Sequence, residues 1–473
     1  MNTKTTIISS QELARQEEFC AQVRACWLSQ GHTPKAYVET YGCQQNEADS
    51  ERIRGMLVAS GYAAAEEAEG ADVVVMNTCA IREHANQRVF GNLGALTHTK
   101  RRHPGQKIFL CGCMAGQTQV VDRVRRSYPH VDGVFSTHHL WQFPEILHRV
   151  LFNGKRVFMT EDEPGSIAEG LPVVRGNTLK AWVSIMYGCN NFCTYCIVPY
   201  VRGRERSRRP EDILAECREL IEKGYKEITL LGQNVNSYGK DLEDKVDFAD
   251  LLAQIAGIPG KFWLRFMTSH PRDAGEKLFD TMARYPNIAK QLHLPFQSGS
   301  SRVLKAMNRH YDRAVYLSKV RYAKSVMPQL VLTSDVIVGF PGETAEEFEE
   351  TLTLISEVEY DALFTFIFSP REGTPAASMA DPTPKEEKNQ RFDRLCALQN
   401  SISEEIHRRY VGRTLEVLID GVDGDKLTAR TEGGRLVRLA GEESLIGSFA
   451  HVRITGSTTW SLTGEIVKEE EHG

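Results

Sequence analysis

Short apolar runs alternate with amphipathic segments along most of this chain. Between residues 35 and 150 the runs are KAYVET, ADVVVM and KIFL, and each leads into a polar turn and then a stretch with helical spacing of apolar residues. Strands that alternate with helical segments are typical of βαβ units, in which a helix returns the chain to the next parallel strand. We therefore predict a parallel α/β sheet domain over residues 34–152.

The same alternation continues with new strands from residue 180 to about 370. The apolar runs there are AWVSIM, KEITLL, FWLRF, QLHLP, LVLTSDVIV and ALFTFIF. Six strand–helix units predict a partial (β/α)6 barrel related to the eight-fold one, with its site at the carboxyl ends of the strands. A long helical pattern over 385–409 follows, and we assign residues 179–409 to this domain.

The last sixty residues have a different pattern. The runs TLEVLIDG, KLTARTE, RLVRLA, SFAHVRITG and SLTGEIV are short and separated by glycine turns. Five such strands predict a small OB-like β-barrel, so that residues 410–473 form a barrel with an acidic tail. Residues 1–33 look like a polar helical extension, and the Gly- and Pro-containing segment 153–178 is expected to be a linker.

Composition and charge narrow the class of protein. The chain has 473 residues, of which 41% are hydrophobic and 25% charged, which is ordinary for a globular protein. It has no apolar run of the roughly 18 residues that a membrane span needs, and no apolar core for a secretory signal near the start. We expect a cytoplasmic protein with no membrane partner, in which eleven cysteines serve metal binding or catalysis before disulfides. A net charge of −5 argues against general nucleic-acid coating but permits a local basic surface.

Three cysteines lie together directly after the first predicted barrel strand. Cys189, Cys193 and Cys196 form a CxxxCxxC pattern. Thiolates are the usual iron–sulfur ligands and a four-iron cluster takes four ligands, so one iron is expected to lack a protein ligand and can bind a substrate. The alternative is a zinc knuckle, but zinc takes four ligands and no His lies in this loop. Cys217, inside an amphipathic helix, is expected to be a buried structural residue.

A second set of cysteines is spread over three strand–helix units of the N-terminal domain. Each cysteine follows a predicted strand end by three residues: Cys43 after Thr40, Cys79 after Met76, and Cys113 after Leu110. Equivalent positions at the carboxyl ends of parallel strands converge on one crevice, which predicts a second three-thiolate cluster. The alternative is isolated buried cysteines. Cys111 comes one residue after its predicted strand end instead of three, and it is left out of the set. Three cysteines in helical patterns are given the alternative interpretation: Cys20, Cys26 and Cys396.

The loop sequence GCNNFCTYC resembles the signature of the radical S-adenosylmethionine (SAM) superfamily. The resemblance implies that the amino and carboxylate groups of SAM chelate the open iron, that reductive cleavage gives a 5′-deoxyadenosyl radical, and that Tyr195 lies near the adenine. The motifs LLGQN, HLPFQSGS and VIVGFPGE end the second, fourth and fifth barrel strands and would open at the same rim. Simple turns are the alternative for the two glycines of the last motif. The expected SAM-binding residues there are Gln233, Asn234, Gln297, Gly339 and Gly342.

Taken together, the three-cysteine domain, the radical SAM barrel and the terminal small barrel resemble the methylthiotransferase family, whose last domain is called TRAM. The resemblance covers about residues 34–470. It implies two [4Fe-4S] clusters and two SAM molecules, with sulfur carried on the N-terminal cluster, the radical generated at the barrel cluster, and the macromolecular substrate held by the TRAM domain. An external electron donor such as flavodoxin or ferredoxin is expected, and we expect a monomer.

Within the family, TYGCQQNEADSE, NTCAIREHA and LLGQNVNSYG resemble most the members that act on carbon 2 of N(6)-dimethylallyladenosine at position 37 of tRNA. The implied partner is a tRNA anticodon stem-loop with a prenylated adenosine. Gln45 departs from the Met often found there. The alternatives are a methylthiotransferase for threonylcarbamoyl-adenosine tRNA or for a ribosomal-protein aspartate, and an iron–sulfur RNA-binding protein without catalysis.

A run of arginines suggests contacts with RNA. The segment VRGRERSRRP would, if extended, project four side chains to one side, as a phosphate contact needs: Arg202, Arg204, Arg206 and Arg208. An equally weighted alternative is a solvated or salt-bridged segment against acidic helices.

Overall fold

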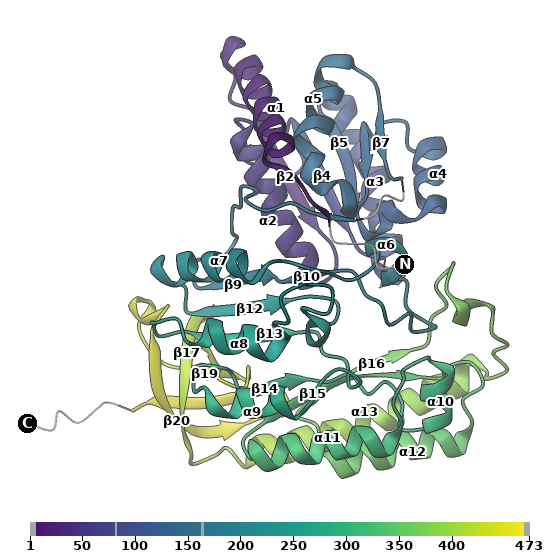
Figure 1. Ribbon diagram of the computed structural model, residues 1–473, viewed down its shortest axis with the longest axis vertical. Helices are drawn as coiled ribbons and strands as arrows, with labels where there is room; N and C mark the ends of the chain where they lie inside the picture. The colour runs from purple at the N-terminus through teal and green to yellow at the C-terminus, as the bar shows by residue number, and fades with distance from the viewer. Residues whose placement is uncertain (1–5, 81–82, 162–164, 468–473) are drawn as a thin grey trace, which may run out of the picture.

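The computed structural model describes residues 6–80, 83–161 and 165–467. Figure 1 shows three domains, with the N-terminal sheet domain above the central domain and the small terminal barrel beside the lower end of the central one. The acidic tail and two residues of the NTCAIREHA motif, Ile81 and Arg82, lie outside the described residues.

The N-terminal domain is a six-stranded parallel sheet with the order β3-β2-β4-β5-β6-β7. The strands are β2 (Lys35–Thr40), β3 (Ala63–Ala64), β4 (Val73–Thr78), β5 (Lys107–Gly112), β6 (Gly133–Phe135) and β7 (Val157–Met159). Helices cover both faces: α2 (Gln44–Ala59), α3 (Glu83–Arg102), α4 (Thr118–Ser127) and α5 (Phe143–Asn153). Every residue of β4 is buried, because the two faces of a parallel sheet both pack against helices. The parallel α/β sheet predicted from the apolar runs is confirmed.

One prediction about this region needs correction. The segment 153–178 is not only a linker, because β7 pairs with β6 and extends the sheet. The helical extension, α1 (Ser10–Ser29), is capped by Ser9 and Glu12 and packs against α2 and α5. It is preceded by β1 (Thr6–Ile7), which pairs in parallel with β8 (Ser166–Ile167), so the start of the chain is tied to the linker.

The central domain is the predicted partial barrel of six strand–helix units. Its strands form two parallel three-stranded sheets, β13-β12-β9 and β14-β15-β16, which a bridge between Leu264 and Ile288 connects. The strands are β9 (Lys180–Ser184), β12 (Glu227–Leu231), β13 (Trp263–Met267), β14 (Gln291–His293), β15 (Val331–Val338) and β16 (Ala362–Ile367). The helices are α7 (Pro210–Glu222), α8 (Phe248–Ala256), α9 (Glu276–Arg284), α10 (Ser301–Ala306), α11 (Arg313–Val326), α12 (Ala345–Val358) and α13 (Lys385–Arg408).

The terminal domain is a closed five-stranded barrel with the order β17-β18-β19-β21-β20. Its strands are β17 (Thr414–Asp423), β18 (Lys426–Thr431), β19 (Leu436–Leu439), β20 (Phe449–Ser457) and β21 (Leu462–Ile466). The barrel packs on the central domain through an ion pair between Arg435 and Asp361 and a bond from Arg265 to the carbonyl of Glu432, 2.6 Å long. The predicted barrel of five short strands is confirmed.

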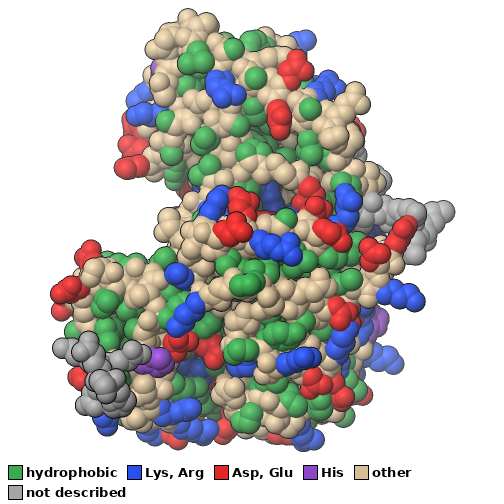
Figure 2. Space-filling model, turned by 60° about the vertical axis from the view of Figure 1, so that its left-hand side comes forward, with side chains coloured by type: hydrophobic (Ala, Val, Ile, Leu, Met, Phe, Trp, Pro, Cys, Tyr) green, Lys and Arg blue, Asp and Glu red, His purple; other side chains and the backbone are tan. Residues whose placement is uncertain are grey.

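The surface narrows between the N-terminal domain and the other two. Figure 2 shows basic and acidic side chains lying next to each other along this junction. Within the part of the chain that the structure describes, none of the helices combines the length and the apolar character that crossing a membrane requires.

Candidate iron–sulfur and SAM site

The central cysteine loop follows a small strand, β10 (Met186–Tyr187), and precedes a short helix, α6 (Val198–Arg202). Cys189 and Cys193 are buried and Cys196 is half-buried. The loop starts at Gly188, which has φ +78°, and a Cβ there would lie 2.0 Å from the carbonyl oxygen of Arg204. Only glycine allows both this conformation and this close approach.

The segment after α10 holds the cysteine loop in place. The carbonyl of Met307 accepts from the amide of Thr194 over 3.1 Å, and the side chain of Asn308 donates to the carbonyl of Phe192 over 3.0 Å. The next residue, Arg309, is buried and donates from Nη1 to the Sγ of Cys193 over 3.4 Å. Burial raises the pKa of Cys189 to about 12 and that of Cys196 to about 12. These thiols therefore keep their protons until a metal replaces them.

The carboxyl ends of the barrel strands carry buried polar atoms that have no hydrogen-bond partner among the described residues. They belong to the cysteine loop and to the loops after β12 and β13: Asn191 Oδ1, Gln233 Oε1, Asn234 Oδ1, Asn236 Nδ2, Ser269 Oγ and His270 Nε2. Buried polar groups in folded proteins nearly always have a partner, so this concentration fits a polar ligand. SAM, with an amino group, a carboxylate, a ribose and an adenine, has the donors and acceptors that such a rim would satisfy.

The expected SAM-binding residues lie at the rim, in different settings. Gln233 and Asn234 are among the residues with unsatisfied atoms. The hydroxyl of Tyr195 accepts from Arg309, and the Tyr195 ring packs against buried apolar side chains that include Phe340. Gln297 has φ +68° and bridges to β15 through its backbone.

Gly339 and Gly342 both have positive φ. The VIVGFPGE motif therefore forms a turn, which was the alternative to SAM binding for these two glycines. The turn is closed by Glu343, whose carboxylate accepts from the amide of Gly339 over 2.6 Å. These observations locate the two glycines at the rim, and their contact with SAM stays a prediction.

The three N-terminal cysteines come together, but not through three equal offsets. β4 and β5 each continue two residues past the predicted ends, to Thr78 and Gly112. Cys79 and Cys113 therefore follow their strands immediately, whereas Cys43 is the N-cap of α2, three residues after β2. The predicted equal offset of three was wrong because the apolar run does not mark where strand pairing stops.

Several observations show that these three thiols converge. A Cβ at Gly42 would lie 2.5 Å from the Cβ of Cys79. Burial raises the pKa of Cys113 to about 12, and the nearby Cys79 and Cys43 add to the rise. Cys111 instead lies within β5, where it packs in the apolar core on the α1, α2 and α5 side.

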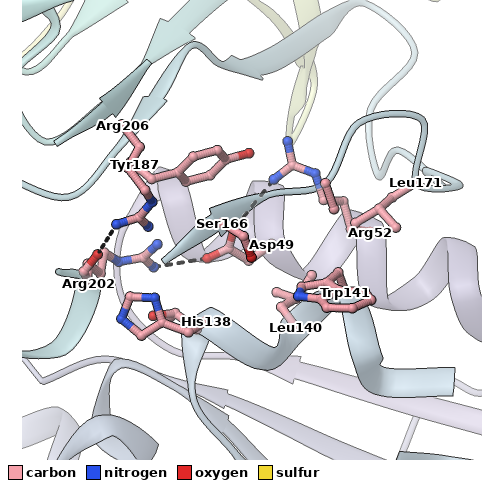
Figure 3. Close-up of a pocket in the computed structure, with 12 residues that line it drawn as sticks. Asp49, Arg52, His138, Leu140, Trp141, Ser166, Leu171, Tyr187, Arg202 and Arg206 are labelled. Carbon is pink, nitrogen blue, oxygen red and sulfur yellow. Dashed lines mark hydrogen bonds and ion pairs between the residues drawn. The ribbon is translucent and has the colours of Figure 1, made fainter. Parts of the chain in front are cut away.

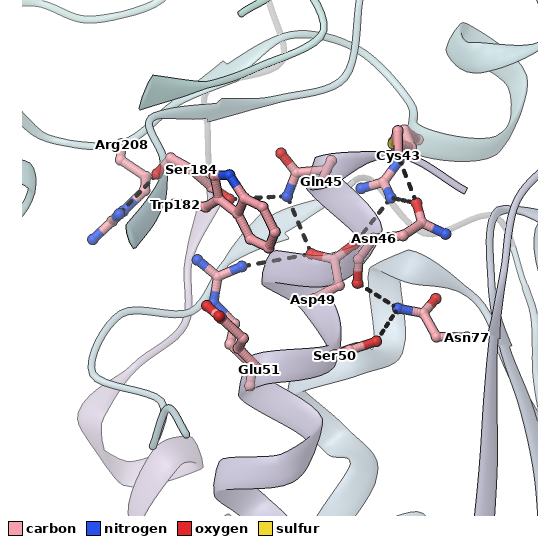
Figure 4. Close-up of polar contacts among 12 residues, drawn as sticks. Cys43, Gln45, Asn46, Asp49, Ser50, Glu51, Asn77, Trp182, Ser184 and Arg208 are labelled. Atoms are coloured by element: carbon pink, nitrogen blue, oxygen red, sulfur yellow. Dashed lines mark hydrogen bonds and ion pairs between the residues drawn. The ribbon is translucent and has the colours of Figure 1, made fainter. Parts of the chain in front are cut away.

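The first turn of α2 carries a buried polar network that reaches the central domain. Figure 4 shows Gln45 pointing from this turn toward Ser184 on β9, to which it donates over 2.9 Å. The side chain of Asn46 donates to the carbonyls of Tyr41 and Thr78, over 3.0 and 2.9 Å, and so ties the loop of Cys43 to the end of β4.

Arg202 crosses from the central domain into the N-terminal cysteine site. It is 5% exposed. Its Nε donates to the Sγ of Cys113 over 3.2 Å, and its Nη2 donates to Asn46 and Asp49 over 3.0 and 2.9 Å. Next to it, Ile197 and Val201 pack on Ala80 and Cys113 in one buried apolar cluster. The two cysteine sites are thus neighbours, with a buried layer from both domains between them.

The structure contradicts the prediction that four arginines share one exposed side. Arg202, Arg206 and Arg208 are buried, and Arg208 pairs with Glu169 and Glu216. Only Arg204 is exposed, where its guanidinium lies 4.3 Å from the centroid of the Phe192 ring. The segment folds as a short helix, a glycine turn and β11 (Arg206–Ser207) instead of one extended strand. The salt-bridged alternative describes Arg208 and also Arg202, which pairs with Asp49 (Figure 3). None of the three buried side chains faces solvent, as a phosphate contact would need.

The donors at both sites are free thiols, which are the usual ligands of iron–sulfur clusters. Among the described residues, no three His, Cys, Asp or Glu side chains are arranged so as to hold one metal ion.

Sequence reasoning missed two residues with prominent roles here, Arg309 and His270. Arg309 lies outside any recognised motif, so no signal in the sequence identified it. His270 follows β13 in the sequence TSHPRD, and a search of the third strand end, like that of the second, fourth and fifth, would have found it. Burial lowers the pKa of His270 strongly, so the ring is neutral.

Comparisons with known proteins agree in all three domains. Residues 183–355 match the radical SAM superfamily, residues 35–136 match Uncharacterized protein family UPF0004, and residues 408–467 match the TRAM domain. The chain is 50% identical over 432 residues to a tRNA-2-methylthio-N(6)-dimethylallyladenosine synthase of Clostridium botulinum (strain Langeland), with 91% of this chain and 96% of that protein covered. A protein of the same name from Clostridium perfringens (strain SM101) is 50% identical over 434 residues, with 91% and 97% covered.

A solved structure is similar in fold. The radical S-adenosylmethionine methyltransferase TsrM from Kitasatospora setae, with tryptophan substrate and a SAM analog bound, aligns with a TM-score of 0.54 over 82% of this chain and 79% of that chain. At 12% identity, this likeness concerns the arrangement of strands and helices alone.

Proposed function

This chain belongs to the family of tRNA-2-methylthio-N(6)-dimethylallyladenosine synthases, and on that premise we propose that it adds a methylthio group to carbon 2 of N(6)-dimethylallyladenosine at position 37 of tRNA. It is a transferase of the radical SAM superfamily, and its cofactors are SAM and two [4Fe-4S] clusters. The observation that carries the proposal is the pair of three-thiol sites on either side of one buried layer.

We assign the ligands of the clusters to the two cysteine triplets. Cys189, Cys193 and Cys196 would hold the barrel cluster, and the N-terminal triplet, Cys43, Cys79 and Cys113, would hold the other. When bound, the barrel cluster and SAM supply a carbon radical, which the unreactive C–H bond of an adenine ring requires. Tyr195 and the unsatisfied atoms of Gln233 and Asn234 would orient SAM, and the burial of the cysteine loop would keep water away from the reacting atoms.

The three domains take different parts in this proposal. Residues 34–152 together with β7 would carry the sulfur, residues 179–409 would perform the radical chemistry, and residues 410–473 would hold the tRNA. A base in an anticodon loop must leave its stack to reach a site inside a barrel, and unpaired loop bases can be splayed out in this way. The anticodon stem-loop with a prenylated adenosine is therefore the proposed partner.

Further partners complete the proposal. A small external electron donor, such as flavodoxin or ferredoxin, would reduce the barrel cluster before each SAM cleavage. We place the protein in the cytoplasm, where tRNA and reducing conditions are found. We also propose that it acts as a monomer, because a single chain contains both cysteine sites.

The test is turnover of synthetic anticodon stem-loops with and without the dimethylallyl group. Burial of that branched apolar group contributes a few kcal/mol, so we expect strong discrimination against unmodified adenosine. Methylthio product and 5′-deoxyadenosine are followed together by mass spectrometry. Equal turnover of both stem-loops would overturn the assignment. Activity only on a threonylcarbamoyl-adenosine loop would overturn it in favour of that substrate.

A further inference from the structure

Two phenylalanines on the last strand of the central domain are exposed. Phe364 is 52% exposed and Phe366 is 45% exposed, although both lie within β16. In closed barrels of this class, the strand side chains that point inward pack together as a core. Exposed aromatic area, which burial would stabilise, often marks the place where a ligand or partner binds. The surroundings of these two rings therefore bear on the function of the domain.

Both rings point away from the helix that covers β16. Alternate residues of a strand face opposite sides of the sheet. Leu363 packs against the core of the central domain, and the side chain of Thr365 hydrogen-bonds with that of Cys396 on α13. Phe364 and Phe366 lie between and beyond these positions and so face the other way. Figure 1 shows α13 on one side of the sheet β14-β15-β16 and the strands β9, β12 and β13 on the other, so the two rings face the interior of the partial barrel.

The neighbouring strands add further side chains to this inner face. In the register of β15 and β16, Phe364 lies opposite Asp335 and Phe366 lies opposite Ile337. His293 on β14 belongs to the same face, because its ring centroid lies 5.7 Å from that of Phe364. Its Nε2 is 3.4 Å from the carboxylate of Asp335. The inner face thus has an apolar strip next to one polar pair.

The carboxyl end of the strip reaches the central cysteine loop. Ile337 packs against the same buried apolar cluster as Tyr195 of that loop. Phe366 is opposite Ile337 and is therefore the ring nearer the cysteines. Phe364 stands two residues earlier on β16, about 7 Å farther from the loop.

The other end of the inner face is closed by the terminal barrel. Gln291 on β14 accepts a hydrogen bond from Arg265 on β13 over 2.7 Å. Arg265 also donates to the carbonyl of Glu432, which belongs to the terminal barrel. A ligand that contacts the strip must therefore enter from the end where the cysteine loop lies.

The chemistry of the substrate fixes how it would lie on this strip. On the proposed function, carbon 2 of the adenine must face the radical formed at the cysteine loop. The dimethylallyl group is carried by the nitrogen on carbon 6, at another edge of the ring, so it points away from the radical and deeper into the barrel. The adenine then lies beside Phe366, and its dimethylallyl group lies beside Phe364. Aromatic side chains stack on bases, and a branched apolar group gains from leaving water.

We propose that this strip selects the prenylated base, with Phe366 stacked on the adenine ring and Phe364 in contact with the dimethylallyl group. The inference rests on the proposed function for the identity of the base. It rests on the inner face itself for the apolar character and the position of the two rings. Both phenylalanines are specificity-determining residues in this account.

Binding measurements separate the two roles. The Kd values of fluorescent anticodon stem-loops with and without the dimethylallyl group are measured anaerobically with the SAM-loaded holoenzyme. Phe364→Ala should lower the preference for the prenylated stem-loop about tenfold, whereas Phe364→Leu should keep most of it. Phe366→Ala should weaken binding of both stem-loops about tenfold and leave their ratio unchanged.

The matched control is Phe152→Ala, because Phe152 is 49% exposed on α5 in the N-terminal domain. Neither Kd should change in this variant. An unchanged preference in Phe364→Ala, with the fold verified by circular dichroism, contradicts the proposal. A loss of SAM affinity in Phe364→Ala without a change in the preference would assign the ring to SAM and would also overturn it.

Cross-linking locates the group directly. A stem-loop whose position 37 carries a diazirine-bearing alkyl chain in place of the dimethylallyl group is irradiated with the holoenzyme, and the adduct is mapped by tandem mass spectrometry. We expect adducts at Phe364 or at His293 beside it, and competition by the natural prenylated stem-loop. Adducts confined to the cysteine loop or to the terminal barrel would refute the proposal. Failure of the proposed function appears separately, as an absence of methylthio product from the unchanged protein, and the cross-link still decides what the strip contacts.

Discussion

The Nε of Arg202 lies 3.2 Å from the Sγ of Cys113, although the two residues belong to different domains. Arg309 and Cys193 repeat the relationship in the barrel, over 3.4 Å. Each cysteine site thus receives one hydrogen bond from a buried guanidinium that lies outside its own cysteine motif. Hydrogen bonds to the sulfur ligands are among the factors that set the reduction potential of an iron–sulfur cluster.

Removing either arginine should therefore shift the potential of one cluster alone. A bond between a charged group and its partner is worth about 1.5–3 kcal/mol, so its loss shifts a one-electron potential by up to about 130 mV. We expect Arg202→Met to make the N-terminal cluster harder to reduce and Arg309→Met to do the same to the barrel cluster. Redox titration followed by electron paramagnetic resonance measures both. A shift of both clusters in either variant would contradict the assignment of one arginine to each site.

The number of iron atoms tests the cysteine assignments. Anaerobically reconstituted protein should contain about eight iron atoms per chain, and Ala at Cys43, Cys79 and Cys113 together should halve that number. Cys111→Ala should leave the iron content unchanged but lower the free energy of unfolding by about 1–2 kcal/mol, because it leaves a gap in a packed core. Loss of a whole cluster in Cys111→Ala would show that Cys111 is a cluster ligand and that its exclusion was wrong.

The two clusters should also be separable in role. Ala at Cys189, Cys193 and Cys196 should abolish 5′-deoxyadenosine formation while one cluster stays visible by Mössbauer spectroscopy. The N-terminal triple variant should still cleave SAM and transfer no sulfur. Full methylthio product from that variant would refute the sulfur-carrying role of the N-terminal site.

Glu343 should make stability depend on pH. Burial raises its pKa to about 7 from the ordinary 4.5. Between pH 4.5 and 7 the folded protein holds a proton that the unfolded chain has lost, so the free energy of unfolding falls as pH rises through this window, by about 3 kcal/mol. Glu343→Gln, which can still accept from Gly339, should remove this component. Chemical denaturation at several pH values measures it, and the exposed neighbour Glu346→Gln is the control.

Trp460 is the strongest candidate on the barrel for a contact with RNA. It is 69% exposed, between β20 and β21, and stacking of a base on an aromatic ring is worth about 1–3 kcal/mol. Trp460→Ala should weaken tRNA binding by that amount without changing either cluster, as measured by filter binding. Leu28→Ala, on the exposed face of α1, should bind normally. Removal of the whole barrel is a poorer test, because it would leave Asp361 without Arg435.

The repeating parts of the fold could be predicted from the sequence. Apolar runs gave the barrel strands to within two residues, because each strand contributes apolar side chains to the barrel core. The ends of β4 and β5 could not be predicted, since Asn77 and Gly112 are poor strand formers that pair because their neighbours do. The pairing of β7 with the sheet was missed for a different reason, because this strand is only three residues long.

The cysteine sites and the rim motifs could be predicted because residue type and spacing are enough to indicate their chemistry. The exposure of the arginines in residues 202–208 was predicted wrongly, because residue type and spacing do not determine it. Whether a guanidinium meets solvent or a buried carboxylate depends on what packs over it, and Arg202 and Arg208 find Asp49 and Glu169 on segments far away in the chain. A charge pattern alone carries no information about such distant partners.

The apolar layer of Ile197, Val201, Ala80 and Cys113 has a consequence for the timing of the reaction. Opening it would also expose the pair of Arg202 and Asp49, so we expect the two metal centres to stay at one separation throughout a catalytic cycle. Movement must then come from the nucleic acid. The order of events would then depend on how long the extruded nucleotide stays between the two fixed metal centres. A tRNA that dissociates early would leave with its adenine ring unmodified.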